Sequence, residues 1–508
     1  MTVSTNIILC TLNARYIHAS LGARYLLANM GDLRPITRLI EHTINNRPID
    51  IVEDLLQHQP SIIGLSVYIW NVEETLQVVK LLKAVSPETV IILGGPEVSY
   101  EVDEQAITSL ADFIIIGQGD MAFADTCRQI LNNTPPLQKI IRPAPFSLSN
   151  IQLPYAEYND DDIANRIIYV EASRGCPFKC EFCLSSLDKT VYPFDLDLFL
   201  VEMQTLFNRG VRSFKFIDRT FNLKIATSIR IMEFFLDKMA EDQVYLHFEL
   251  IPDHLPEKLK AVLQRFPEHS LQFEIGIQSF SPDIQTLISR KQDNNKTIDN
   301  LRWIRQHTHA HIHTDLIIGL PNETVDSFAE GFNALVALNP HEIQVGILKR
   351  LRGTPIIRHT DDYDMRYSPT APYSILSNSL IDFSTMQQLK RFARYWDIIA
   401  NSGRFKFSKE LLLGDSAFES FLTLTNWLHQ ESGQTHKISL ERMFTLLYRA
   451  MTEVLQRDVD TTIEVLLQDY AASGLKGKPA FSKQTITALK QTKNRAESRQ
   501  KRHQISGH

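Results

Sequence analysis

The 508-residue chain has few cysteines, no long apolar run and no excess of positive charge. Its five cysteines include an odd, closely spaced set, which argues against a disulfide framework and predicts a reducing compartment. No apolar stretch approaches the roughly 18 residues of a membrane span, and no basic targeting segment opens the sequence. A net charge of −6 does not suggest a general nucleic-acid binder. We expect a cytoplasmic protein that partners neither membrane nor nucleic acid.

The most specific motif is CxxxCxxC, formed by Cys176, Cys180 and Cys183. It follows the apolar, strand-like run 167–170, so the three thiols fall on a loop that leaves a strand. Cysteine thiolates are the usual ligands of iron–sulfur clusters, and a [4Fe–4S] cubane needs one ligand for each iron. Because the other two cysteines are far away in the sequence, the fourth iron would be open to a substrate or cosubstrate.

A structural zinc site is the alternative, since zinc is often held by three cysteines and one histidine. Such a site usually finds its fourth ligand within a short loop, whereas the nearest downstream histidine is His247, beyond two predicted helices. The spacing therefore favours the cluster over zinc and over plain thiols.

The motif resembles that of the radical S-adenosylmethionine (SAM) superfamily. This resemblance implies that SAM chelates the open iron through its amino and carboxylate groups, and that Phe182 packs on the adenine. Downstream of the motif, strand-like and helix-like segments alternate, which is typical of a parallel sheet with crossover helices. The six predicted strands are 167–172, 211–217, 245–251, 271–278, 311–318 and 343–348. They predict a partial (β/α)6 barrel of the TIM type.

Polar residues stand at the carboxyl ends of these strands, where βα barrels carry their chemistry. Asp218 follows the second strand, where the superfamily often has Gly-Gly-Glu, and is expected to bind the SAM ammonium. Segments at the fourth and fifth strands resemble those that contact SAM, although Glu274 and Asp315 could equally be capped strand-end carboxylates. The residues assigned to SAM by this resemblance are Phe182, Asp218, Glu274, Gln278, Ser279, Arg290, Gly319 and Glu323.

Residues 5–140 show a second α/β pattern upstream of the motif. Helical patterns separate its strand-like runs, and the clearest helix follows Asn71, with Glu74 placed as in a capping box. The predicted strands are 7–12, 36–42, 62–67, 90–93 and 113–116. Such a doubly wound, Rossmann-like sheet binds ligands outside the carboxyl ends of its strands. No GxGxxG follows the first strand, which argues against an NAD or FAD domain.

Two glycine-bearing turns fall at those strand ends, over residues 94–99 and 117–120. Glycines let a backbone approach a ligand closely, although they are also ordinary residues of strand-to-helix turns. Before a radical SAM core, this pair of turns resembles the cobalamin-binding domain of B12-dependent radical SAM proteins. The resemblance assigns cobalamin contacts to Gly94, Gly95, Pro96, Glu97, Ser99, Gly117 and Gly119.

The segment after the first strand departs from DxHxxG, the element through which many cobalamin proteins offer a histidine to cobalt. Tyr16 stands in place of the aspartate, and Gly22 comes one residue late. His18 is therefore interpreted as a loop histidine that does not bind cobalt. The N-terminal part also lacks the second cysteine triad of a methylthiotransferase, since it holds only Cys10 and Cys127.

Beyond the sixth strand the patterns are helical, as in the amphipathic segments 386–399 and 442–455. This region resembles an uncharacterised domain appended to some B12-type radical SAM proteins. The last 34 residues hold nine Lys or Arg against one acid and are interpreted as a disordered tail, with an anionic partner as the alternative. The predicted segments are a cobalamin-binding domain (1–140), a linker (141–165), a radical SAM core (166–358), a helical domain (359–474) and a basic tail (475–508).

These features predict a radical SAM enzyme that uses a [4Fe–4S] cluster, SAM and cobalamin. It is expected to cleave SAM reductively to a 5′-deoxyadenosyl radical and to methylate an unactivated carbon of an unknown substrate. A reductant protein such as flavodoxin or ferredoxin is the expected partner. Rearrangement, cyclisation or dehydrogenation without methyl transfer is the first alternative. The second, a non-catalytic sensor or carrier, would not need the polar residues at the barrel strand ends.

Overall fold

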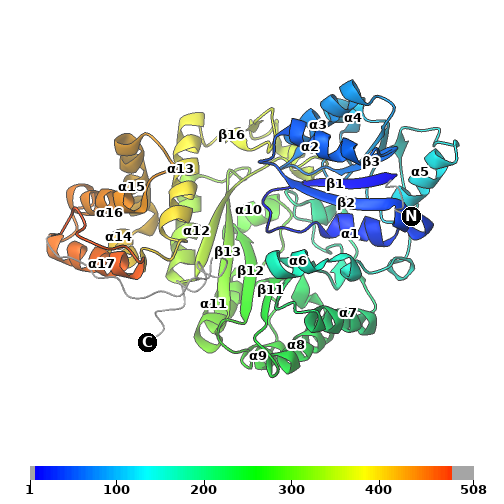
Figure 1. The fold of residues 1–508 in the computed structure, drawn as a ribbon. Coiled ribbons are helices and arrows are strands. Elements are labelled where there is room, and N and C mark those ends of the chain that lie inside the picture. Colours follow the sequence, from blue (N-terminus) through cyan, green and yellow to red (C-terminus); the bar gives the residue numbers. More distant parts are fainter. Residues whose placement is uncertain (1–5, 483–508) are drawn as a thin grey trace. The chain divides into compact units, whose positions relative to one another are not determined.

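The computed structural model describes residues 6–482 (Figure 1). These residues form two compact units. The first consists of residues 6–249 with segments 349–357 and 368–373, and the second consists of residues 250–348, 358–367 and 374–482. Each unit thus contains part of the chain that follows the sixth predicted barrel strand.

The first unit begins with a parallel sheet of order β2-β1-β3-β4-β5-β6. Its strands are β1 (Ile7–Asn13), β2 (Thr37–Thr43), β3 (Ile62–Ser66), β4 (Val90–Gly94), β5 (Phe113–Ile115) and β6 (Ile140–Ile141). The five predicted strands are confirmed, and β6 is an addition at the sheet edge. The order, with β1 inside the sheet, is that of a doubly wound fold.

Helices cover both faces of this sheet because its central strands are apolar on both sides. In β1, Ile8 and Cys10 pack on one face and Ile7 and Leu9 on the other, following the two-residue period of a strand. The helices are α1 (Leu21–Ala28), α2 (Pro48–Gln57), α3 (Val72–Val85), α4 (Ala106–Leu110) and α5 (Ala122–Leu131). The core clusters place α2, α3 and α4 on one face and α1 and α5 on the other (Figure 1).

Helix α3 begins after Asn71 as predicted, but the predicted capping box is wrong. Asn71 is fully buried, and its Nδ2 donates to the carbonyls of Leu12 (3.0 Å) and Ser66 (3.1 Å). Its Oδ1 accepts from the Tyr68 amide at 2.8 Å. The side chain therefore joins the carboxyl ends of β1 and β3 and is not available to cap the helix.

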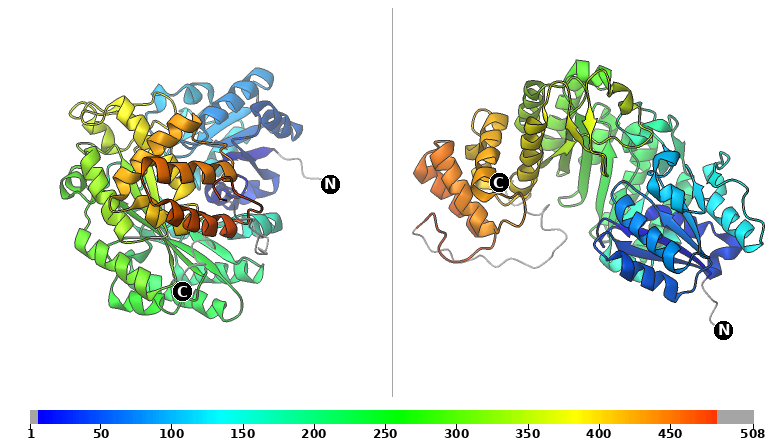
Figure 2. Two further views of the ribbon diagram at one scale, coloured as in Figure 1. Left: turned by 90° about the vertical axis from the view of Figure 1, so that its left-hand side faces the viewer. Right: turned by 90° about the horizontal axis from the view of Figure 1, so that it is seen from above.

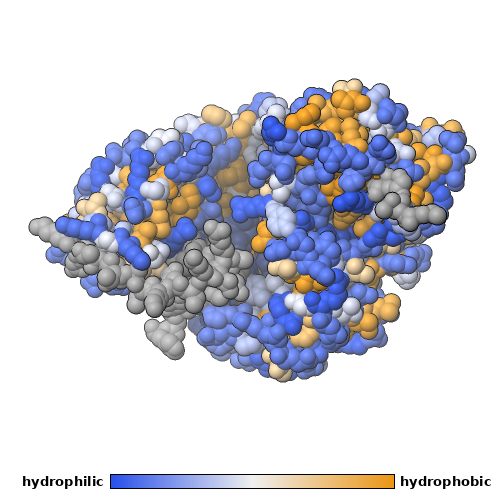
Figure 3. All heavy atoms as spheres, in the orientation of Figure 1, coloured by the Kyte–Doolittle hydropathy of each residue, from blue (hydrophilic) through white to orange (hydrophobic). Residues whose placement is uncertain are grey.

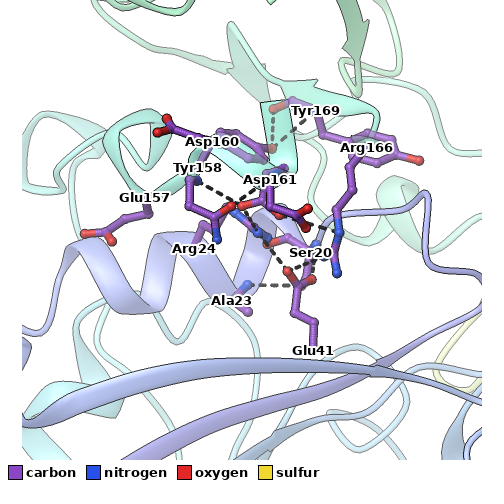
Figure 4. Close-up of polar contacts among 12 residues, drawn as sticks. Ser20, Ala23, Arg24, Glu41, Glu157, Tyr158, Asp160, Asp161, Arg166 and Tyr169 are labelled. Atoms are coloured by element: carbon purple, nitrogen blue, oxygen red, sulfur yellow. Dashed lines mark hydrogen bonds and ion pairs between the residues drawn. The ribbon is translucent and has the colours of Figure 1, made fainter. Parts of the chain in front are cut away.

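The segment between the two sheets contains helix α6 (Asp160–Asn165), held to the first sheet by buried ion pairs (Figure 4). The Arg24 guanidinium, from α1, lies 2.7 Å from Glu41 of β2 and 2.7 Å from Asp162 of α6. Arg166 lies 2.7 Å from the same Glu41 oxygen. Although burial raises it, the Arg24 charge holds the pKa of Glu41 below its usual value.

The central sheet has the order β14-β13-β12-β11-β10-β7. All six predicted strands are present, as β7 (Ile168–Val170), β10 (Ser213–Phe216), β11 (Tyr245–Leu250), β12 (Leu271–Gln278), β13 (His311–Ile318) and β14 (Glu342–Ile347). Pairing is parallel from β7 through β10 to β11, and from β12 through β13 to β14. The helices that alternate with these strands are α7 (Leu196–Asn208), α8 (Ile225–Met239), α9 (Glu257–Leu263), α10 (Pro282–Leu287), α11 (Asn294–His307) and α12 (Val325–Ala337). The parallel six-stranded α/β core agrees with the predicted partial barrel.

The C-terminal part of the second unit is helical, as predicted, and is coloured yellow to red in Figure 2. Its helices are α13 (Phe383–Ile399), α14 (Lys406–Leu413), α15 (Ala417–Ser432), α16 (Leu440–Arg449) and α17 (Val459–Ala472). Aromatic side chains join α13 and α15 to α12, with ring centroids of Phe332 and Trp396 4.7 Å apart and those of Phe392 and Phe421 5.1 Å apart. Asn401, just after α13, accepts from the Ile343 amide (3.0 Å) and donates to the Ile343 carbonyl (2.8 Å) of β14.

Hydrophilic residues cover most of the described surface on the face drawn in Figure 3. Within residues 6–482, none of the helices combines the length and the apolarity that crossing a bilayer requires. The predicted basic tail lies, from residue 483 onward, outside the described residues.

Candidate active site

The three motif cysteines lie on the loop after β8 (Ser173–Arg174), two of them buried and Cys183 partly exposed. None of the five cysteines, all of which the structure describes, forms a disulfide. Burial raises the pKa of the Cys176 thiol, as do the nearby Cys183 and Cys180, while the Phe178 amide and Arg219 lower it. The three thiols are thus close enough to influence one another.

The backbone fixes the shape of this loop. Gly175 has φ +87°, and a Cβ there would lie 1.9 Å from the Thr190 carbonyl oxygen, so only glycine fits. The Cys176 amide donates to the Asp188 carbonyl at 3.2 Å, and β8 pairs with β9 (Tyr192–Pro193). Among the described residues no three His, Cys, Asp or Glu side chains are grouped as around one metal ion.

Asp218 lies beside the strand that leads into the motif. It is 4% exposed, and its carboxylate accepts from the Ala172 amide (2.9 Å) and the Ser173 hydroxyl (2.6 Å). Burial raises the pKa of Asp218 to about 7. The structure shows Asp218 holding the backbone before the cysteine loop, whereas its contact with the SAM ammonium stays a prediction.

Predicted SAM residues gather in the second unit at the carboxyl ends of β12 and β13. The Ser279 hydroxyl donates to Glu323 Oε1 at 2.6 Å, and Arg290 donates to the Gly276 carbonyl. Glu323 is 2% exposed, its Oε2 has no hydrogen-bond partner within the described chain, and burial raises its pKa to about 8. A neutral, buried carboxyl with one unused oxygen is suited to a polar ligand group. Gln278, at φ +71°, ends β12, and Gly319 directly follows β13.

Glu274 and Asp315 lie within their strands rather than at the ends. Glu274 is opposite His313 in the register of β12 and β13, and the Asp315 carboxylate is 3.3 Å from His313 Nε2. Although burial lowers it, the Asp315, Glu342 and Glu274 carboxylates hold the pKa of His313 above its usual value. The sequence analysis missed this histidine; its signal is the alternation His311, His313, Asp315 along one face of β13.

A cavity of about 310 Å³ lies in the first unit near the carboxyl ends of β3, β4 and β5. Four residues assigned to cobalamin line it, namely Gly94, Gly95, Gly117 and Gly119. Its other wall residues, which the sequence analysis missed, include Tyr25, Gly64, Tyr68, Phe123 and Arg174. A Cβ at Gly64 would lie 2.5 Å from the Phe123 ring, so this glycine makes room for the ring beside the cavity. A glycine inside an apolar strand is the signal that marks such a close approach.

The remaining residues assigned to cobalamin do not line the cavity. Ser99 joins the two glycine turns, because its hydroxyl donates to the Gly95 carbonyl (2.8 Å) and accepts from the Gly117 amide (3.1 Å). Glu97 is buried, accepting from Arg352 Nε (3.0 Å) and from the Tyr373 hydroxyl (2.8 Å). Ser99 thus supports the two turns, and the contacts of Pro96, Glu97 and Ser99 with cobalamin stay a prediction.

Arg174 connects the cavity with the cysteine loop. Its two terminal nitrogens donate to the two Asp120 oxygens, both at 3.0 Å, and its Nε donates to Glu171 at 2.8 Å. The guanidinium also lies 4.4 Å from the Tyr25 ring centroid. Because Arg174 comes two residues before Cys176, one side chain fixes a cavity wall and the start of the loop.

His18 does not line this cavity. Its Nδ1 is 2.7 Å from the Tyr169 hydroxyl, and burial lowers its pKa. His18 is thus a hydrogen-bonded loop histidine, and our interpretation that it does not bind cobalt stays a prediction.

Three family models match the chain. Residues 8–126 match the B12 binding domain, residues 170–335 the radical SAM superfamily, and residues 361–506 a protein of unknown function, DUF4080. The chain thus combines an N-terminal B12-binding domain with a radical SAM domain.

Two curated proteins are similar to this chain over more than half of its length. The chain is 24% identical over 62% of its length to the cobalamin-dependent radical SAM methyltransferase TokK of Streptomyces tokunonensis, and spans 51% of that protein. It is 23% identical over 56% of its length to the 2-(S-pantetheinyl)-carbapenam-3-carboxylate methyltransferase of Streptantibioticus cattleyicolor, and spans 46% of it. The chain thus spans about half the length of these two relatives.

Solved structures show the same fold. The cobalamin-dependent SAM radical enzyme OxsB, with aqua-cobalamin and SAM bound, aligns at a TM-score of 0.63 and 14% identity, over 92% of this chain and 80% of OxsB. The radical SAM methyltransferase TsrM of Kitasatospora setae, with cobalamin and a [4Fe–4S] cluster bound, aligns at 0.55 and 15% identity, over 70% of this chain and 77% of TsrM.

Proposed function

We propose that this protein is a cobalamin-dependent radical SAM methyltransferase that methylates an unactivated carbon. The observation that carries the proposal is the Asp120–Arg174 pair, with both contacts at 3.0 Å, which joins a glycine-walled cavity to the loop that carries the three motif cysteines. A sensor or carrier of one cofactor would not require this connection. We also propose the domain limits that were predicted from the sequence.

The residues of the first unit fit the two groups that the proposal assigns to them. Cys176, Cys180 and Cys183 would hold the [4Fe–4S] cluster and leave one iron to SAM. The cavity of about 310 Å³ is large enough for part of the cobalamin molecule, and the glycines of its wall would let the backbone lie close to that part. When bound, the cluster supplies the electron that cleaves SAM, and cobalamin supplies the methyl group.

In the second unit, Ser279 and Glu323 would bind polar atoms of SAM, and Arg290 would hold the end of β12. With its pKa raised to about 8, Glu323 carries a proton at neutral pH and can donate a hydrogen bond. Glu274, Gln278 and Gly319 are the other residues of this unit that we propose to contact SAM, and Asp218 and Phe182 are those that we propose in the first unit. The substrate would be recognised by residues 361–506, and a flavodoxin or ferredoxin would deliver the electron.

The test is the product balance of the reconstituted enzyme under a strong reductant. Radical methylation consumes two SAM molecules, one as methyl donor and one as radical source, so S-adenosylhomocysteine and 5′-deoxyadenosine should both form. Both are quantified by mass spectrometry, with cell extract as the source of substrate. Cys176→Ala should abolish 5′-deoxyadenosine, whereas Cys10→Ala, a substitution within the N-terminal sheet, should not.

The other outcomes identify the alternatives. Deoxyadenosine without S-adenosylhomocysteine or methylated cobalamin would indicate a radical reaction without methyl transfer. If cofactor-loaded protein formed neither product, the enzyme proposal would be wrong and the sensor or carrier would stand.

A further inference from the structure

A second cavity, of about 810 Å³, lies in the second unit at the end of the central strands opposite the predicted SAM residues. One wall is formed by the residues just before β12, β13 and β14, including His269, His309 and His341. The other walls come from α14, from Ala400 directly after α13, and from the C-terminal parts of α11 and α12. The cavity therefore lies between the radical SAM match and the DUF4080 match of the chain.

Three cationic side chains line this cavity. They are Arg305 of α11 and Lys406 and Lys409 of α14. Arg305 Nε donates to the Asn339 carbonyl at 3.0 Å, and within residues 6–482 neither Arg305 nor Lys409 forms an ion pair. Burial lowers the pKa of Lys409, and the Arg305 charge lowers it further. Burial also lowers the pKa of Lys406, and the charges of Arg305 and Lys409 lower it further. The Asp469 carboxylate acts in the opposite direction and raises it.

Other polar groups of the wall are consistent with an anionic ligand. His269 Nδ1 is buried and has no hydrogen-bond partner within the described chain. His341 Nδ1 accepts from the Ile312 amide at 2.9 Å, so its proton is on Nε2. The carboxylates of the wall, Glu268, Glu410 and Asp415, are exposed, and Glu268 lies 3.5 Å from His309.

We propose that this cavity binds a small molecule carrying a phosphate or carboxylate group, held by Arg305, Lys406 and Lys409. Cations brought together in a partly desolvated space repel one another, and an anion between them removes that cost. Guanidinium and ammonium groups form strong charge-assisted hydrogen bonds with both kinds of oxyanion. The volume is within the range of small-molecule sites. Because it lies at the amino ends of the strands, the ligand would act on the enzyme without taking part in SAM cleavage.

The test follows thermal unfolding of the full chain against inorganic phosphate and, separately, citrate, with chloride holding the ionic strength constant. A ligand of the native state raises Tm in a saturable way, and we expect a Kd of about 1 mM or tighter for one of the two probes. Lys409→Met should weaken the binding of that probe about tenfold or more, because it removes a charge-assisted hydrogen bond. Arg302→Met, on the exposed side of the same helix as Arg305, is the matched control and should leave affinity unchanged.

A measurement on the unmutated protein covers the case in which Lys409→Met does not fold. Acetylation of lysines by acetic anhydride is mapped by mass spectrometry with and without the probe. Protection of Lys406 and Lys409, but not of the exposed Lys296, supports the site. Saturation by phosphate alone assigns a phosphate group, and saturation by citrate alone assigns a carboxylate. Absence of saturation and protection with both probes overturns the proposal.

Discussion

Two regions of the molecule bury carboxylates in opposite ways. In the first unit, Glu41 and Asp162 both contact the Arg24 guanidinium at 2.7 Å, and Arg166 adds a second cation. In the second unit, Glu323 receives only the Ser279 hydroxyl and keeps one oxygen without a partner in the described chain. The pKa of Glu41 is lowered and that of Glu323 is raised. A paired carboxylate fastens structural elements together, whereas an incompletely paired one remains available to a ligand.

Breaking the paired region should have the largest effect on stability. Arg24→Met leaves two buried carboxylates without their shared cation, and we expect a loss of about 3 to 5 kcal/mol in the free energy of unfolding. Urea denaturation followed by circular dichroism measures it. Arg47→Met, which breaks an exposed ion pair with Asp50, should change stability little. Equal effects of the two variants would contradict the structural role of the buried network.

Asp218 is intermediate between the ion-paired carboxylates of the first unit and Glu323. Its carboxylate is buried and has no cation beside it in the contacts above, but it accepts two hydrogen bonds. Asp218→Ala leaves the Ala172 amide and the Ser173 hydroxyl without their acceptor, which costs about 1 to 3 kcal/mol. We also expect reduced iron incorporation, measured by absorbance and iron content, because these residues lead into the cysteine loop. The Asp218→Asn side chain can accept from the Ala172 amide and donate to the Ser173 hydroxyl. This variant should therefore keep most of the stability and most of the iron content. Iron content that stayed at the wild-type level in Asp218→Ala would argue against this role.

The incompletely paired carboxyl of Glu323 should mainly affect how the free energy of unfolding depends on pH. Because the pKa of Glu323 rises from its ordinary 4.5 to about 8 on folding, the native state holds this proton more tightly than the unfolded state. Its contribution to stability is complete below pH 4.5 and is lost as the pH rises through 8, with a slope of at most about 1.4 kcal/mol per pH unit. Denaturation across this range should show that slope flattened in Glu323→Gln. Glu330→Gln, an exposed substitution on α12, is the control and should keep the wild-type slope. An unchanged slope in Glu323→Gln would disprove the assignment of this pH dependence to Glu323.

Local patterns in the sequence predicted much of the fold. The strands 271–278 and 311–318 were predicted with the bounds that β12 and β13 have, because their apolar residues alternate over eight positions. The short strands β5 and β7 end one or two residues earlier than predicted, and β7 also begins one residue later. The three cysteines were identified by spacing alone, which does not depend on the rest of the chain.

Side chains that depend on distant partners could not be predicted. Asn71 reads as a helix cap, and only the approach of Leu12, 59 residues earlier, turns it to the strand ends. Glu97 was assigned to cobalamin with its neighbours, but its hydrogen bond with Arg352, 255 residues later, could not be foreseen. The packing of Phe123 over Gly64 and the reach of Arg174 to Asp120 are likewise tertiary contacts.

The contact of Asn401 with Ile343 bears on how this protein can be divided. The outer strand of an open sheet presents unpaired amides and carbonyls, which invite another chain to pair with it and aggregate. At β14, the carboxamide of Asn401 satisfies both backbone groups of Ile343, as a neighbouring strand would. A fragment cut before α13 would expose that edge together with the apolar side of α12. The DUF4080 region thus serves the barrel as a cover for its open border.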